Sequence, residues 1–105
     1  MTAEAEMERP KLLVFGSRRS GPCRKLDAHL AQVLQRRGGH NAFRLVRVDV
    51  DDRPDLAERF RISTVPTLLV VEGKSVRSRL AGLSGPARIA EFLEPWLRRS
   101  PAAVR

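Results

Sequence analysis

Apolar residues in the first third of the chain form one continuous run and then one helical repeat. Residues 11–17, with the sequence KLLVFGS, are apolar almost throughout and end at glycine and serine, which is typical of a strand buried on both faces. After this run, apolar residues recur at intervals of three and four up to the pair Gly38-Gly39. This spacing places them on one side of a helix and predicts a single apolar face. The repeating residues are Leu26, Leu30, Val33 and Leu34.

Three further apolar stretches predict strands. Residues 43–50 and 65–71 are rich in valine and leucine, and residues 75–82 alternate apolar and polar positions as the outer strand of a hairpin does. The sequence EGK at 72–74 contains a glycine and provides the turn between the last two strands. The pattern therefore predicts four strands, of which the last two are antiparallel.

Two more helices separate or follow these strands. The segment PDLAERF predicts a short helix with Pro54 in its first turn and Asp51 or Asp52 as its N-cap. A last helix is predicted after Ser84 as N-cap, and Pro95 should distort its final turn. The resulting order, β-α-β-α-β-β-α, predicts an α/β fold in which a four-stranded mixed sheet has helices on both faces.

The length of the chain, 105 residues, fits a single domain, since domains cluster at about 100 to 150 residues. We expect this domain at 11–98 as a monomer, with flexible segments at 1–10 and 99–105. The apolar stretch at 65–71 is far shorter than the roughly 18 residues of a membrane-spanning helix, so no membrane association is expected. The N-terminal sequence MTAEAEMER is acidic and polar, whereas a secretory signal is basic and then apolar, so we expect a cytoplasmic protein.

The net charge of +8 would in principle attract nucleic acid. However, the basic residues are scattered, tyrosine is absent, and basic and aromatic residues do not alternate as in RNA-binding proteins, so no nucleic-acid partner is expected. His29 and His40 have no paired metal-ligand spacing with the single cysteine, so we expect neither a metal nor a cofactor. The candidate chemistry therefore belongs to one thiol.

That thiol, Cys23, lies where the first long helix should begin, in the sequence SRRSGPCRKL. Serine is among the most favourable N-cap residues, so Ser20 is predicted to cap this helix and to place Cys23 at its third position. The helix N-terminus and the surrounding cations favour a thiolate, whereas burial opposes it. From the residues alone, Cys23 is either a reactive thiol or an inert, buried side chain. The surrounding cations are Arg18, Arg19, Arg24 and Lys25.

Three pieces of the sequence, in this order, resemble the thioredoxin family. SGPCR matches the family's W-C-G-P-C-K/R motif at positions 21–24. ISTVPTLLV matches a family motif at Pro66, and LAGLSG matches at Gly82 the glycine that follows the last strand. The resemblance covers residues 12–97. It implies a thioredoxin-like fold of three layers, α/β/α, and chemistry on thiols and disulfides.

The chain departs from this family where the family's reaction takes place. The family's first cysteine, which attacks a substrate disulfide, is Ser20 here, and the tryptophan before it is Arg19. The family's buried carboxylate falls at Val14, and the lysine near it at Arg47. The resemblance then implies that dithiol reductase activity is absent and that Cys23 at most exchanges disulfides alone. Whether the chain is an enzyme stays open.

The family also implies a cis peptide bond between Val65 and Pro66, which would leave the backbone of Val65 free to pair with a ligand lying across Cys23. Because arginines replace the family's apolar rim, we expect this ligand to be an acidic partner protein or glutathione. The alternative is a non-catalytic binding module that uses the same groove. The expected binding residues are Arg19, Gly21, Pro22, Val65 and Pro66.

Two other families share part of this pattern. In glutathione transferases, which have this fold, a hydroxyl near the position of Ser20 stabilises a glutathione thiolate, but those proteins need a second, helical domain that we do not expect in these 105 residues. The S-x-x-C spacing also resembles peroxiredoxins. Their proline four residues before the serine is Gly16 here, which disfavours a peroxidase.

Overall fold

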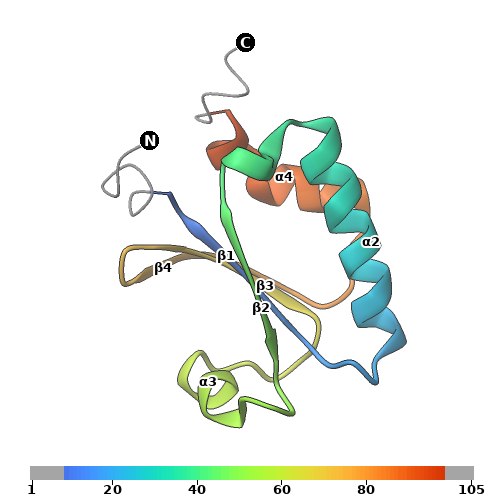
Figure 1. Ribbon diagram of the computed structural model, residues 1–105, viewed down its shortest axis with the longest axis vertical. Coiled ribbons are helices and arrows are strands. Elements are labelled where there is room, and N and C mark those ends of the chain that lie inside the picture. The colour runs from blue at the N-terminus through green and yellow to red at the C-terminus, as the bar shows by residue number, and fades with distance from the viewer. Residues whose placement is uncertain (1–8, 99–105) are drawn as a thin grey trace.

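The computed structural model describes residues 9–98 of the chain (Figure 1). The strands are β1 (Lys11–Gly16), β2 (Arg44–Asp49), β3 (Thr67–Glu72) and β4 (Ser75–Ala81). The helices are α2 (Gly21–Arg36), α3 (Pro54–Arg59) and α4 (Pro86–Leu97), with a 3-10 turn, η1 (Gly39–Asn41), after α2. The predicted order β-α-β-α-β-β-α is confirmed. Of the segments predicted to be flexible, all but Arg9 and Pro10 lie outside the described residues.

The four strands form one mixed sheet in the order β2-β1-β3-β4. β1 and β2 run parallel, with Leu13 opposite Val46, and α2 makes the crossover between them. β3 is antiparallel to both of its neighbours, and the predicted hairpin accounts only for its pairing with β4. Just before β1, the carbonyl of Pro10 accepts a hydrogen bond from Arg44 N–H at 2.9 Å. The mixed four-stranded sheet predicted from the sequence is therefore confirmed.

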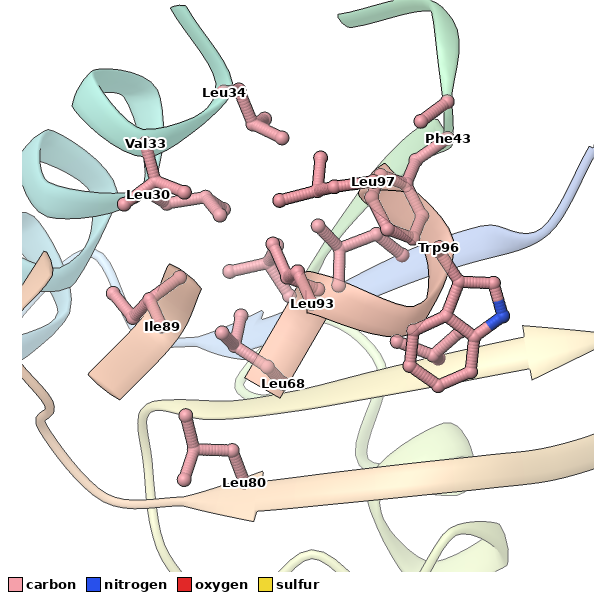
Figure 2. Close-up of a cluster of buried hydrophobic side chains, with 14 of the residues drawn as sticks. Leu30, Val33, Leu34, Phe43, Leu68, Leu80, Ile89, Leu93, Trp96 and Leu97 are labelled. Atoms are coloured by element: carbon pink, nitrogen blue, oxygen red, sulfur yellow. The ribbon is translucent and has the colours of Figure 1, made fainter. Parts of the chain in front are cut away.

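Helices cover both faces of the sheet, so the molecule has three layers (Figure 1). α2 and α4 lie side by side on one face, and their apolar side chains meet over Leu68 and the rest of that face (Figure 2). Because side chains of a strand alternate between faces, Leu12 of β1 belongs to this cluster and Phe15 to the opposite one. There, Phe60 at the end of α3 packs on Phe15 with ring centroids 5.7 Å apart. β1 is thus buried on both faces, as predicted.

Both N-caps predicted for the later helices are wrong. The residue before α3 is Arg53, not Asp51 or Asp52, and it makes no capping bond with its side chain. The residue before α4 is Gly85, not Ser84, and it has no side chain to cap with. In both helices proline is the first residue, where the N–H that it lacks is one that a helix N-terminus leaves unpaired in any case.

Two prolines set the ends of elements. β3 begins at Thr67, two residues later than predicted, since Pro66 has no N–H to give to the strand ladder. Pro95 lies in the last turn of α4, and the helix continues through it to Leu97. Trp96 and Leu97 are buried in the core at this end, so packing holds the turn in place (Figure 2). Within residues 9–98, no helix has the length and apolar character needed to cross a membrane.

Candidate functional site

The start of α2 is held by Ser20. Its backbone is extended (φ −98°, ψ 121°), as an N-cap requires, and its hydroxyl oxygen accepts a hydrogen bond from Cys23 N–H at 3.3 Å. Gly21 and Pro22 follow as the first two helical residues, so Cys23 is at the third, as predicted. Proline here gives up an N–H that a helix N-terminus leaves unpaired in any case. The helix start is therefore complete with a serine at position 20.

The thiol of Cys23 lies against the end of β1. Its Sγ accepts a hydrogen bond from Ser17 N–H at 3.4 Å, and only 9% of the residue is exposed. Cys23 is a free cysteine. A Cβ atom on Gly16 would lie 3.2 Å from this sulfur, closer than nine in ten real contacts of a Cβ. The absence of a side chain at Gly16 is therefore what gives the thiol its place.

Pro66 lies beside this thiol in the lining of the same cavity. The peptide bond between Val65 and Pro66 is cis. Pro66 is buried, and its carbonyl accepts a hydrogen bond from Gly82 N–H at 2.7 Å, which fastens the loop after β4 to the start of β3. Leu83, which follows Gly82 in this loop, has an apolar side chain and is 46% exposed. The three motif regions of the sequence therefore meet at one end of the sheet.

A cavity of about 270 Å³ lies next to Cys23, between α2 and the ends of β1 and β2. Its apolar lining includes Val14, Phe15 and Val48. Among the predicted site residues, Cys23 and Pro66 line it. Five others lie outside its lining: Arg19, Ser20, Gly21, Pro22 and Val65. Its charged lining residues are Arg18, Arg24, Asp27, Arg47 and Asp49.

Aspartates after β2 tie that loop to the loop before α2. Ser17 Oγ donates a hydrogen bond to Asp51 at 2.8 Å. Arg18 pairs through Nε with Asp49 at 3.2 Å and through Nη2 with Asp52 at 3.3 Å. The pKa of Asp49 is held below its ordinary value of 3.8, chiefly by the backbone N–H of Asp51 and further by Arg18. The two loops thus form one hydrogen-bonded unit beside the thiol.

This arrangement changes what the arginines can offer to a partner. Arg18 is already paired within the chain. Arg19 is exposed and has no ion pair in the part of the chain that the structure describes. Of these two arginines, Arg19 is therefore the one that supports the expected preference for an acidic partner.

Asp27 is a residue of the cavity that sequence reasoning missed. It lies one turn after Cys23 on α2, and its Oδ1 is 3.4 Å from Nε of Arg47 on β2. Residues four apart on a helix share one side, so its spacing from Cys23 was the signal. The cavity therefore has a carboxylate and a guanidinium from α2 and β2, whereas Val14, at the family's carboxylate position, is apolar and buried.

Residues 9–98 contain no group of three His, Cys, Asp or Glu suited to a metal ion.

The fold and this site together define a class of protein. A mixed sheet between two helical layers, with a G-P-C helix start beside a buried proline loop, is the architecture of thioredoxin-like proteins. The chain belongs to the thioredoxin family, whose family model, described as thioredoxin, matches residues 3–95.

Relatives and solved structures agree with this assignment. Mitochondrial thioredoxin of Bos taurus is 30% identical over 87 residues, which cover 83% of this chain and 51% of that protein, so the chain spans about half the length of this relative. Thioredoxin of Mycolicibacterium smegmatis is 26% identical over 85% of this chain and 80% of its own length. The crystal structure of the germline-specific thioredoxin Deadhead from Drosophila melanogaster has a TM-score of 0.75 at 18% identity, over 88% of this chain and 85% of that chain. This last likeness shows the shared fold.

Proposed function

We propose that this chain carries out thiol–disulfide exchange through Cys23 alone. Cys23 forms a mixed disulfide with a partner protein or with glutathione, and a second thiol then releases it. The observation that carries this proposal is the position of Cys23, which is the third residue of α2 and lines a cavity together with Pro66, while its Sγ accepts a hydrogen bond from Ser17 N–H. Membership of the thioredoxin family supports this class of reaction.

A dithiol reaction is not part of the proposal. The hydroxyl of Ser20 accepts a hydrogen bond from Cys23 N–H, and no histidine or carboxylate among the described residues hydrogen-bonds to it. Without an adjacent base, a serine hydroxyl is not a nucleophile near neutral pH. Ser20 therefore supports the helix that carries the thiol.

A second candidate function is a non-catalytic binding module that uses the groove at Pro66. The small exposed fraction of Cys23, 9%, favours it, because a thiol that meets little solvent reacts slowly. The exposed side chains of Leu83 and Arg19 would then contact the partner. We propose an acidic partner in either case, because Arg19, Arg24 and Lys25 are exposed cations near the site. A monomeric, cytoplasmic protein belongs to the same proposal.

The reaction of the folded chain with oxidised glutathione distinguishes these two functions. We expect intact-mass measurements to show one glutathione on Cys23 under native conditions, and reduced glutathione to remove it. The variant Cys23→Ser is the control and should gain no mass. Adducts that form only after the chain is unfolded in urea would support the binding module instead. In an insulin-reduction assay we expect no turnover, and clear turnover would contradict the structural role given to Ser20.

A further inference from the structure

Two loops meet beside Cys23, because β1 and β2 are parallel and end at the same edge of the sheet. Gly16, the last residue of β1, is opposite Asp49, the last residue of β2, so the loops that follow these strands begin next to each other (Figure 1). We propose that Asp51, in the loop after β2, is a positioning residue for Cys23, because it holds through Ser17 the N–H that donates to Sγ. The inference rests on the proposed exchange function, because it names a residue that controls the reaction of the same thiol.

The N–H of Ser17 is the hydrogen-bond donor of the sulfur. It lies 3.4 Å from Sγ of Cys23, and within residues 9–98 it is the one group that donates to this atom. A hydrogen bond donated to the charged form of an acid favours that form, and the thiolate is the form of a cysteine that attacks a disulfide. The place of this N–H therefore affects how fast Cys23 reacts.

Three further hydrogen bonds orient Ser17. Its carbonyl accepts from Ser20 N–H at 3.1 Å, and its hydroxyl oxygen accepts from Arg19 N–H at 3.3 Å. Both of these bonds are internal to the loop before α2, so they move with it. The third bond reaches a distant part of the chain, because Ser17 Oγ donates to Oδ2 of Asp51 at 2.8 Å, 34 residues away. Asp51 thus fixes Ser17 relative to the loop after β2.

Asp51 is itself fixed to the end of β2. Its backbone N–H donates to Oδ1 of Asp49 at 2.8 Å, and the side chain of Asp49 is only 17% exposed. The other oxygen of Asp49 accepts from the N–H of Arg18, the residue after Ser17, at 3.3 Å. The two aspartates therefore hold the loop before α2 at two consecutive residues, with the N–H of Ser17 directed at the sulfur.

The exchange reaction uses this N–H twice. The thiol of Cys23 loses its proton to solvent, and the thiolate then attacks one sulfur of a disulfide. A new S–S bond joins Cys23 to one half, and the other half leaves as a thiolate with the electron pair of the broken bond. When a second thiolate attacks the mixed disulfide, it forms a disulfide with that half, and the electron pair returns to Sγ. Ser17 N–H thus faces a negatively charged sulfur before the first step and after the second.

The rate at which oxidised glutathione adds to Cys23, followed by intact mass, tests this role. Asp51→Ala and Ser17→Ala remove the two ends of one hydrogen bond, so each should lower the rate about threefold, and the double variant should be no slower than either. Loss of a hydrogen bond to a charged group corresponds to about tenfold, and the change in nucleophilicity offsets roughly half of this on a logarithmic scale. The control Asp55→Ala removes the same charge from a pair with Arg53 and should keep the wild-type rate.

The variant Asp51→Asn separates position from charge. Asparagine keeps an oxygen that can accept from Ser17 Oγ, so this variant should react at least as fast as the wild type. A carboxylate near a thiol disfavours the thiolate, so an effect of charge alone would make Asp51→Ala faster than the wild type, not slower. Amide hydrogen exchange, measured by NMR, reports the contact directly. The N–H of Ser17 should exchange several-fold faster in Asp51→Ala, while the N–H of Val50, which donates to the carbonyl of Gly16 at 2.9 Å, should not change.

Several results would overturn the inference. An Asp51→Ala variant that reacts as fast as the wild type, or faster, contradicts a positioning role, and so does an equal loss of rate in Asp51→Asn. Faster exchange of both the Ser17 and the Val50 amides would show a general loss of stability in place of a local release. No adduct on the folded wild type would refute the proposed function itself, whereas an adduct that forms equally fast in all variants refutes only the role of Asp51.

Discussion

Replacing Ser20 with alanine separates its structural role from any role in the reaction. The change removes the hydroxyl that accepts from Cys23 N–H at 3.3 Å and leaves this N–H without its capping partner. Loss of an N-cap serine lowers the free energy of unfolding by about 1 kcal/mol. In a domain of this size, that loss should lower the Tm by about 4 to 8 °C. Ser20→Gly should lower the free energy of unfolding by only roughly a few tenths of a kcal/mol, because glycine is a tolerated N-cap.

Urea titration and thermal unfolding, followed by far-UV circular dichroism, measure these differences. Ser84→Ala is the matched control, because Ser84 also precedes a helix but α4 has Gly85 as its N-cap residue. Its stability should change by less than about 0.5 kcal/mol. The rate of mixed-disulfide formation at Cys23 is measured in the same variants and should stay close to the wild-type rate, since Ser20 does not line the cavity.

The two measurements can refute the reasoning separately. A Ser20→Ala variant as stable as the wild type contradicts the capping argument. Loss of exchange at Cys23 without loss of stability shows instead that the hydroxyl takes part in the reaction. Equal destabilisation by Ser20→Ala and Ser84→Ala removes the distinction between the two serines.

Three further predictions concern the core, the pH dependence and the missing cysteine. Leu68→Ala removes a fully buried side chain and should lower the free energy of unfolding, measured by urea titration, by about 2 to 5 kcal/mol. Its control, Val76→Ala at an exposed position of β4, should change this free energy by less than about 0.5 kcal/mol. Equal effects of the two variants would contradict the packing. The pKa of Asp49 is lowered by the N–H of Asp51 and by Arg18, so its ionised carboxylate stabilises the folded chain. This stabilisation is present at pH values above 3.8, the ordinary pKa of the group, and is lost as the pH falls through the lowered pKa of the folded state. Asp49→Ala should therefore be less stable than wild type near neutral pH, with the gap closing in thermal scans below pH 3.8, and a gap that persists in acid rules out this cause. Ser20→Cys should form an intramolecular disulfide with Cys23 on oxidation and should reduce insulin. This reduction should be slow, because the apolar, buried Val14 provides no proton acceptor. If both thiols of the variant stay free after oxidation, the alignment of the motif is contradicted.

The layers of the fold could be predicted because their signals are local. The continuous apolar run of β1 and the repeat of three and four residues in α2 each determine which faces are buried, and both were predicted correctly. The cap at Ser20 was also local, since its bond spans three residues. The caps of α3 and α4 are not set by such a local bond. Asp51 and Asp52, which suggested the cap of α3, bind distant partners instead: Asp51 accepts from Ser17, and Asp52 pairs with Arg18, each 34 residues away.

The cavity could not be predicted, because it depends on contacts between distant residues and on a side chain that is absent. The partner of Asp27, a residue of α2, is Arg47, which lies 20 residues away on β2. Gly16 reads in the sequence as the end of a strand, and nothing local indicates that the thiol of Cys23 occupies the space beside it. Glycine is informative here only once its neighbour across the turn is known.

Two small residues position Cys23, and they act on different atoms of it. At Ser20, a hydroxyl keeps the start of α2 and supplies no sulfur, so the resemblance to the family motif ends there. At Gly16, the missing side chain leaves room for Sγ, and both Gly16 and Cys23 line the cavity. A Cβ atom at Gly16 would press on Sγ itself, whereas Ser20 contacts Cys23 at its backbone N–H. Substitutions at Gly16 should therefore change exchange more than substitutions at Ser20, although Ser20 is the one that lies within the family's motif.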